Sequence, residues 1–408
     1  MYQPPSSFLS CAKFVLLFFL FTVISCKKPI PSNKKQWFKG NLHTHSYWSD
    51  GDEFPEVIMQ WYKSHDYDFV ALTDHNILAE GDKWVKIRPD SIYQNGFKSY
   101  LDTFGSNWVN YKKDSLNNIY VKLKTFEEYR TKFEAPNTFL ILQAEEISDR
   151  FENKPIHINA TNLKKKIQPQ GGNSVVDVMQ NNLDEIAKQK DSLNIPILAH
   201  INHPNFHYSI TVEDMIALKK EQFFEVYNGH PDVRNSGDSN HISTEKMWDL
   251  INIAYIENNK PLMYGLATDD SHHYHKKGHQ WSNAGRGWVM VQADTLSPKS
   301  IINAMESGNF YASTGVFLDD VSTDNSTLSV TIKKEANLTY KITFIGCKKG
   351  NNTPEALKTV TGDKASFKIT KDILFVRCKV TSSKHHDNPI ENLIYETAWT
   401  QPTIYKRD

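Results

Sequence analysis

Two histidines separated by one residue give the first indication of chemistry in this chain. His43 and His45 flank Thr44 in a segment predicted to be extended, where side chains at positions i and i+2 point to the same face. Both imidazoles can therefore reach one cation. Exposed His-x-His pairs are common on strands, so the pair needs support from other residues. A second polar group, Thr73-Asp74-His75-Asn76, follows the next predicted strand and provides that support.

The distribution of histidine points the same way. Of 16 histidines, 14 lie between His43 and His279, a clustering that scattered surface histidines are not expected to produce. Metal ligation is the economical explanation. The chain also carries 47 basic and 47 acidic residues, so its net charge is zero and no global field favours nucleic acid or an anionic membrane.

Strands and helices are predicted to alternate through most of the chain. Such alternation predicts parallel strands joined by helical crossovers, either as a barrel or as a doubly wound sheet. The predicted strands are 37–45, 68–75, 138–148, 155–162, 196–202, 223–229, 262–270 and 287–293, and the predicted helices are 55–64, 174–192, 212–220, 243–258 and 298–307.

Ionisable residues recur where the predicted strands end, which favours the barrel, because the loops at the carboxyl ends of barrel strands converge on the axis. Nitrogen and oxygen donors without thiolate suit Mn, Fe or Zn. Clustered cations lower the pKa of a bridging water, supply hydroxide at neutral pH and polarise the oxygen of the group attacked, so no serine or cysteine nucleophile is required. The strand-end residues are His43, His45, His75, Glu146, His203, Asp270 and His272.

These motifs, taken in order, resemble the polymerase and histidinol phosphatase (PHP) superfamily over about residues 38–316. Later segments, such as Glu225-Val226-Tyr227-Asn228-Gly229, further resemble its carbaryl-hydrolase-like metallohydrolase branch. The motifs that carry the main resemblance are His43-x-His45 with Ser49-Asp50-Gly51, Thr73-Asp74-His75-Asn76, Glu146-Ile147-Ser148, Pro155-Ile156-His157-Ile158, His203-Pro204-Asn205 and Asp270-Ser271-His272.

The resemblance implies a distorted (βα)7 barrel of the PHP type that holds two or three divalent Mn, Fe or Zn ions at its mouth. It assigns His43, His45, Glu146 and Asp270 to the first metal, with Glu146 bridging; His157 and His203 to the second; and Asp50, His75 and His272 to the third. His200 competes with His203 for one role, and His203 is favoured because it carries the proline that follows in the family.

Two further residues have open roles. Asp74 either orients a ligand or accepts a proton, or it only caps a turn. Arg286, in a glycine-rich loop, either binds a substrate phosphate or pairs with a carboxylate.

The remaining segments define the expected domains. We expect a metallohydrolase barrel over 37–316, with an aromatic-rich insertion at 78–136 that is either a lid or a satellite core, and a small antiparallel β-sandwich over 317–408. Cys347 and Cys378 lie in the latter and either form a disulfide or pack as free thiols.

The N-terminus is expected to address the protein to the cell envelope. Residues 1–26 predict a signal peptide, because an apolar run from Phe14 ends in Val23-Ile24-Ser25-Cys26, which resembles a bacterial lipobox. Cys26 would then anchor the protein to the membrane through lipid, and 27–36 would form a tether, leaving the body periplasmic or surface-facing. A soluble secreted product is the alternative.

The sequence therefore predicts a metal-dependent hydrolase, foremost a phosphoesterase that acts on a small phosphate mono- or diester. A carboxyl-ester or carbamate hydrolase is the first alternative, because the same hydroxide attacks carbonyl carbon. A binding protein that keeps its metals without turnover is the second.

Overall fold

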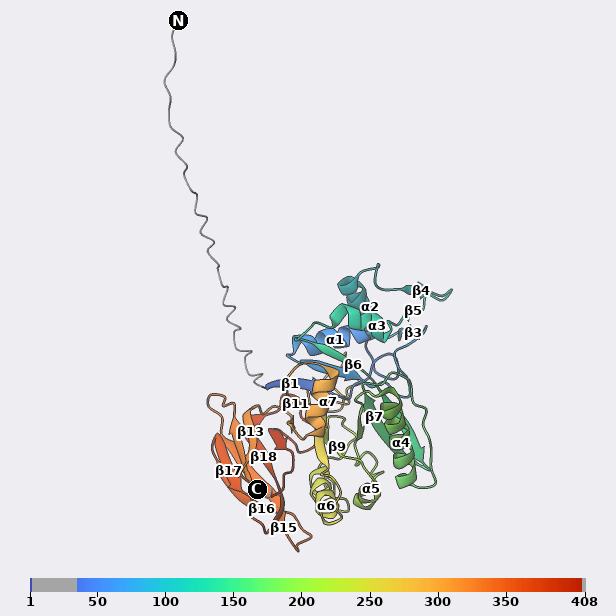
Figure 1. Cartoon of the computed structure of the whole chain (residues 1–408). Helices are drawn as coiled ribbons and strands as arrows, with labels where there is room; N and C mark the ends of the chain where they lie inside the picture. The colour runs from blue at the N-terminus through green and yellow to red at the C-terminus, as the bar shows by residue number, and fades with distance from the viewer. Residues whose placement is uncertain (2–34, 406–408) are drawn as a thin grey trace. The chain divides into compact units, whose positions relative to one another are not determined.

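The main β-sheet has thirteen strands in the order β10-β9-β8-β7-β6-β2-β1-β11-β12-β19-β18-β15-β16. Figure 1 shows how helices and strands are arranged in the chain. The computed structural model describes Met1 and residues 35–405, and the chain from Lys35 onward forms one compact unit. The strands are β1 (Gln36–Asn41), β2 (Phe69–Leu72), β6 (Leu140–Phe151), β7 (Lys154–Thr161), β8 (Leu198–Ile201), β9 (Phe223–Asn228), β10 (Tyr264–Thr268), β11 (Trp288–Ala293), β12 (Phe310–Ser313), β15 (Tyr340–Lys348), β16 (Glu355–Thr361), β18 (Ile373–His385) and β19 (Tyr395–Thr400).

The sheet is only partly parallel. β1, β2 and β6 run parallel, as do β8, β9 and β10, and these pairings match the expectation. β7 is antiparallel to both β6 and β8, and here the expectation of parallel strands was wrong. Only Glu152 and Asn153 separate β6 from β7, with Glu152 at a φ of 54°. A connection this short forms a hairpin, because a parallel crossover needs a dozen or more residues.

The segments that follow β1 and β10 lie side by side at the candidate ligands. Thr44, just beyond β1, forms an isolated parallel bridge with Ser271, just beyond β10. Two backbone hydrogen bonds, from Asp270 to His43 and from His45 to Ser271, are both 2.9 Å long. Among the described residues no ladder joins β1 to β10, so the structure shows a mixed α/β fold whose sheet curls without closing into a full barrel.

Alternate residues of β2 pack into different cores. Phe69 and Ala71 join a buried cluster that includes Ile301 of α7, whereas Val70 packs with residues of α1. Helices α4 to α6 cover another buried cluster over β7 and β9, which includes Trp248. The helices are α1 (Pro55–Ser64), α2 (Ser91–Phe104), α3 (Phe126–Phe133), α4 (Val175–Leu193), α5 (Val212–Ala217), α6 (Thr244–Glu257) and α7 (Pro298–Glu306).

The insertion at 78–136 contains α2, α3 and a small antiparallel sheet of β3 (Trp84–Lys86), β4 (Tyr111–Lys113) and β5 (Ile119–Lys122). Its aromatic residues join the core that includes α1: the ring of Tyr100 stacks on Phe54 with centroids 4.0 Å apart. Tyr100 and Trp108 both donate to Glu56 Oε1 at 2.6 Å. The insertion is therefore packed against the body of the protein as a satellite core.

The C-terminal strands are antiparallel, and they continue the main sheet through the pairing of β12 with β19. A second sheet consists of β13 (Leu318–Asp324), β14 (Thr327–Ile332) and β17 (Lys364–Lys368). Cys347 and Cys378 are buried free thiols, so the disulfide alternative is not found.

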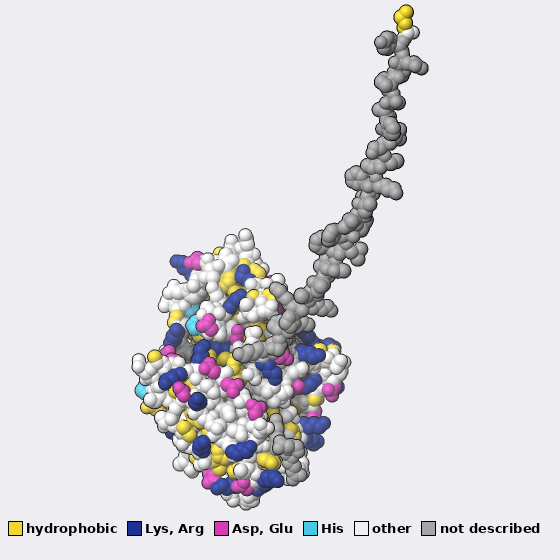
Figure 2. All heavy atoms as spheres, turned by 60° about the vertical axis from the view of Figure 1, so that its left-hand side comes forward, with side chains coloured by type: hydrophobic (Ala, Val, Ile, Leu, Met, Phe, Trp, Pro, Cys, Tyr) yellow, Lys and Arg dark blue, Asp and Glu magenta, His cyan; other side chains and the backbone are white. Residues whose placement is uncertain are grey.

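The expected signal peptide, Cys26 and nearly all of the expected tether fall on residues 2–34, which lie outside the described part of the chain. Among the described residues, no helix combines the length and apolar character needed to cross a bilayer. On the face drawn in Figure 2, basic and acidic side chains are interspersed.

A buried ion pair joins the C-terminal strands to α6. Arg377 of β18 donates to Asp249 from Nε at 2.6 Å and from Nη2 at 2.8 Å, and the two side chains are 1% and 4% exposed. Arg377→Met would leave the Asp249 carboxylate buried without its cation. We expect a loss of about 3–5 kcal/mol in the free energy of unfolding, measured by urea denaturation. The double variant Arg377→Met, Asp249→Leu should recover most of it, and a loss below about 1 kcal/mol in the single variant would contradict this account.

Candidate metal centre

The structure brings all nine predicted metal ligands together. Their ligand atoms form overlapping groups in which every atom lies within 4.8 Å of the others in its group. The groups relevant to the prediction are His43, His45 and Asp270; His43, Glu146 and His203; His75, Glu146 and His157; and His45, Asp50, His75 and His272. These residues come from the ends of β1, β2, β8 and β10, from the loop after β1, and from the hairpin of β6 and β7.

The innermost part of the cluster consists of His43, His45, Glu146 and Asp270. His43 Nε2 lies 3.3 Å from Glu146 Oε1 and 3.2 Å from Asp270 Oδ1. His45 Nε2 lies 3.4 Å from Glu146 Oε2 and 3.2 Å from Asp270 Oδ1. Both Nε2 atoms are buried without a hydrogen-bond partner, whereas Glu146 Oε2 lies 2.7 Å from His75 Nδ1. Buried polar atoms are normally paired, so these convergent, unpartnered donors fit a divalent cation.

Glu146 lies between this inner part and two further histidines. Its Oε1 is 3.0 Å from His157 Nδ1 and 3.4 Å from His203 Nε2. On β6 it does not end the strand, which continues to Phe151, and this differs from the expectation. One carboxylate thus faces imidazoles on several sides, as a bridging ligand would.

Asp50 marks the open side of the cluster, since its side chain is 57% exposed. Its carboxylate lies 3.4 Å from His272 Nε2 and 3.5 Å from His75 Nε2. A Cβ on the following Gly51 would come within 2.5 Å of the His45 backbone, so only glycine permits this approach of the loop.

Asp74 positions the loop that carries Asp50. It is buried, and its oxygens accept from the Ser46 amide (2.8 Å), the Ser46 hydroxyl (2.7 Å) and the Ser49 hydroxyl (2.6 Å). Ser49 Oγ also lies 3.4 Å from His45 Nδ1. Of the roles considered for Asp74, this geometry supports positioning of the ligand loop.

Arg286 cannot serve the phosphate role as the structure places it. Its side chain is buried, and all five of its N–H groups donate to backbone or amide oxygens. The acceptors are the carbonyls of Gly229, Gly278, Trp281 and Asn388, and the side-chain oxygen of Asn388. The alternative, a pair with a carboxylate, is not formed by the guanidinium either. Arg286 instead holds together, through hydrogen bonds, the loops that contain Gly229, Gly278 and Asn388.

Glu225 of β9 is a part of the site that the sequence prediction missed. Its Oε1 accepts from His43 Nδ1 and from the Thr268 hydroxyl, both at 2.7 Å. Its Oε2 accepts from the His203 amide and from Asn228 Nδ2, both at 2.8 Å. The carboxylate therefore holds the proton of His43 on Nδ1, which leaves Nε2 free for a metal. An acidic residue inside the buried run Phe223–Asn228 was the available signal.

The structure also separates His200 from His203. His200 is buried with its Nε2 3.5 Å from Glu225 Oε1, whereas His203 faces Glu146.

His230 also follows a strand, β9, but the sequence prediction did not include it among the candidate residues. The His230 ring lies 5.4 Å from that of His272, and its Nδ1 accepts from the Asp232 amide.

Protonation in the metal-free cluster follows from burial and from the neighbouring charges. Burial, and then the neighbouring His272 and His75, lower the pKa of His45 to about 3. Burial lowers the pKa of His75 as well, but the charges of Glu146 and Asp50 outweigh it and raise that pKa to about 11. Burial would raise the pKa of Glu146, yet the imidazoles around it hold that pKa well below its usual range.

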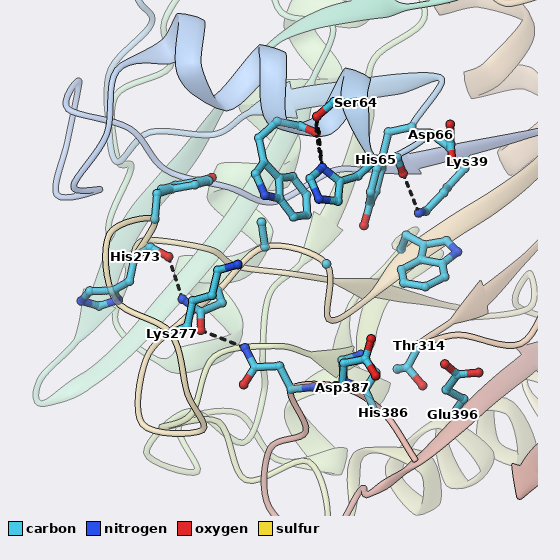
Figure 3. A pocket seen from close by; sticks show the side chains of 18 of the residues that line it. Lys39, Ser64, His65, Asp66, His273, Lys277, Thr314, His386, Asp387 and Glu396 are labelled. Carbon is cyan, nitrogen blue, oxygen red and sulfur yellow. Dashed lines mark hydrogen bonds between the residues drawn. The ribbon is translucent and has the colours of Figure 1, made fainter. Parts of the chain in front are cut away.

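A separate cavity of about 780 Å³ does not involve the nine ligands. Its lining, shown in Figure 3, includes Lys39 and Lys277 as well as Asp66, Asp387 and Glu396. The lining thus carries both positive and negative side chains, and none of the nine predicted metal ligands belongs to it.

Comparison with known proteins yields structural resemblances only. No family model and no curated protein matches the chain. A two-domain protein from Bacteroides vulgatus that contains a predicted PHP-like metal-dependent phosphoesterase has a TM-score of 0.40 at 16% identity, covering 91% of this chain and 96% of that one.

Two further solved structures are less similar. A protein from Bifidobacterium adolescentis, named as a metal-dependent phosphoesterase, has a TM-score of 0.29 at 10% identity over 58% of this chain and 88% of that one. An amidohydrolase from Chromobacterium violaceum, with bound sulfate and no metal, has a TM-score of 0.28 at 12% identity over 66% and 96%. These values are too low to assign a family, so the argument for function rests on the ligand cluster.

Replacement of Glu225 tests its hold on His43. Glu225→Gln puts an amide NH₂ where a carboxylate oxygen accepts two hydrogen bonds, so the amide faces donors or forces His43 to move its proton to Nε2. We expect metal affinity to fall by roughly 10- to 100-fold, measured by metal titration and elemental analysis. Glu221→Gln is the matched control: Glu221 is also buried, and its Oε1 accepts from Gln222 and Phe223, which glutamine can retain. Equal metal binding by the two variants would refute the role of Glu225.

Metal uptake should release protons. His75 is protonated at pH 7 in the metal-free protein because its pKa lies near 11, whereas a metal ligand must be neutral. Metal affinity should therefore rise with pH from neutral toward 11, and about one proton or more per chain should appear when Mn or Zn is added at pH 7 in dilute buffer. A pH indicator measures this release. Binding without any release would show that the metal does not displace the proton of His75.

Proposed function

We propose that this protein is a metal-dependent hydrolase that acts on phosphate mono- or diesters. The observation that carries the proposal is the convergence of His43 Nε2 and His45 Nε2, both buried and unpartnered, on the carboxylates of Glu146 and Asp270. The exposed side chain of Asp50 lies beside them. An all-nitrogen and oxygen donor set favours Mn, Fe or Zn. Bound ions of this kind lower the pKa of water and polarise a phosphoryl oxygen, which is the chemistry that ester hydrolysis requires.

The residue groupings support two or three ions. We assign His43, His45, Glu146 and Asp270 to the first, His157 and His203 to the second, and Asp50, His75 and His272 to the third. The position of Glu146 between His43 and His203 supports its role as the shared ligand. Asp74 and Glu225 position ligands, and the opening at Asp50 gives the substrate access from solvent.

The wider setting is also part of the proposal. The bridge between Thr44 and Ser271 supports a distorted seven-stranded barrel of the PHP type, in which β10 lies next to β1. The sequence Val23-Ile24-Ser25-Cys26 supports export and lipid attachment at Cys26, with the hydrolase held at the cell envelope.

Substrate and metal assays test the function together. Purified protein comprising residues 34–408 is analysed for metal content and assayed with nitrophenyl phosphate, bis-nitrophenyl phosphate and nitrophenyl acetate in the presence of Mn or Zn. We expect two or more metal ions per chain and turnover of a phosphate compound. Preference for the acetate would instead support a carboxyl-ester or carbamate hydrolase, and metal without turnover would support a binding protein.

Single replacements locate the activity in the cluster. His43→Ala and Asp270→Ala each remove an innermost donor, so both should lower kcat/KM by more than about a hundredfold and reduce bound metal. His385→Ala, which alters an exposed histidine of β18 outside the cluster, is the control. Unchanged metal content in both cluster variants would disprove the assignment.

A further inference from the structure

A cavity of about 570 Å³ adjoins the metal cluster at the hairpin of β6 and β7. Its lining includes His157, a proposed ligand, and Ser148, whose hydroxyl lies 2.5 Å from His75 Nδ1. The remaining lining residues are Asp149, Arg150, Glu152, Asn153 and Pro155. The cavity therefore adjoins one proposed metal ligand, His157, and the Ser148 neighbour of another, His75, and it extends along the hairpin.

Arg150 lies on the same face of β6 as the cluster. Side chains alternate along a strand, so Glu146, Ser148 and Arg150 share one face. The register of the hairpin places Ser148 opposite His157 and Arg150 opposite Pro155. Among the described residues that line the cavity, Arg150 is thus the one lysine or arginine, and it lies on the ligand face of β6 two positions beyond Ser148.

The guanidinium of Arg150 has no hydrogen bond or ion pair among the described residues, whereas Arg286 and Arg377 are fully engaged or paired with a carboxylate. The neighbouring carboxylate of Asp149 is already occupied. Its Oδ1 accepts from the Arg150 amide at 2.8 Å, and its Oδ2 accepts from Gly171 and Asn182 at 2.8 and 2.9 Å. The exposed Glu152 at the hairpin turn is the other carboxylate of the cavity, and it forms no ion pair with Arg150.

An exposed, unpaired guanidinium beside a catalytic cluster selects anions. Arginine binds carboxylate or phosphate through two parallel hydrogen bonds. Among the described lining residues Pro155 alone is apolar, so this cavity suits a charged group better than a hydrophobic one. We propose that Arg150 binds a second anionic group of the substrate, remote from the phosphate ester that reacts. This inference rests on the proposed function, and it defines the substrate class as phosphate esters that carry another carboxylate or phosphate.

Matched substrates with and without a second anion test the proposal. The kinetic constants for phenyl phosphate and 4-carboxyphenyl phosphate are compared in the wild type, in Arg150→Met and in Lys154→Met. Lys154 lies in the same hairpin, but it alternates to the other face and does not line the cavity. We expect the wild type to favour the carboxylated ester by about tenfold, mainly through KM. Arg150→Met should lose this preference and keep its activity on phenyl phosphate, while Lys154→Met should resemble the wild type.

A binding measurement separates this inference from the proposed function. Calorimetric titration with phenylphosphonate and 4-carboxyphenylphosphonate, which are not hydrolysed, reports the preference even if no phosphate ester is turned over. A preference that is present in the wild type and absent in Arg150→Met supports the role of Arg150, whatever the outcome of the turnover assays. Equal binding of the two phosphonates by the wild type, or an unchanged preference in Arg150→Met, would overturn it.

Discussion

The buried carboxylate of Glu146 is the constraint on which the rest of this structure depends. Its side chain is 1% exposed, and an ionised carboxylate in the interior costs several kcal/mol unless positive charge or a metal compensates for it. The compensating imidazoles come from four separate elements: His43 from the end of β1, His75 from the end of β2, His157 from β7 and His203 from the end of β8. The sheet must curl for these four elements to converge on Glu146, so the geometry of the cluster depends on the curvature of the sheet.

Much of the cluster was predictable because parallel strands bring their carboxyl ends to one edge, whereas Asp50 and His157 were predicted only from the resemblance to the PHP superfamily. Side chains that follow β1, β2 and β10 are therefore neighbours in space although they are far apart in sequence, as His43, His75 and Asp270 demonstrate. The same reasoning failed at β7, where direction depends on a two-residue turn. The turn Glu152-Asn153 contains no glycine, which is the usual sequence signal for a two-residue hairpin. The positive φ of Glu152 is known only from the structure.

Buried polar residues were harder to interpret than ligands, because their roles depend on distant partners. The sequence around Arg286 gives no sign that Gly229 and Asn388 supply its acceptors, which lie 57 and 102 residues away. Glu225 is a charge inside an apolar strand that the prediction passed over, because its role depends on His43 and the His203 amide, which lie against it only in the folded protein. Residue type predicts what a group can bind, whereas tertiary packing decides which groups are left free to bind it.

The pairing of β12 with β19 has a consequence for how the chain reaches its folded state. β12 ends at Ser313, but the strand that covers its open side spans Tyr395–Thr400. A chain that folds during synthesis, amino end first, keeps this hydrogen-bonding edge exposed until β19 has been made, and an exposed edge can pair with other chains. Protection of the β12 edge would then be needed until β19 has been synthesised and paired with it.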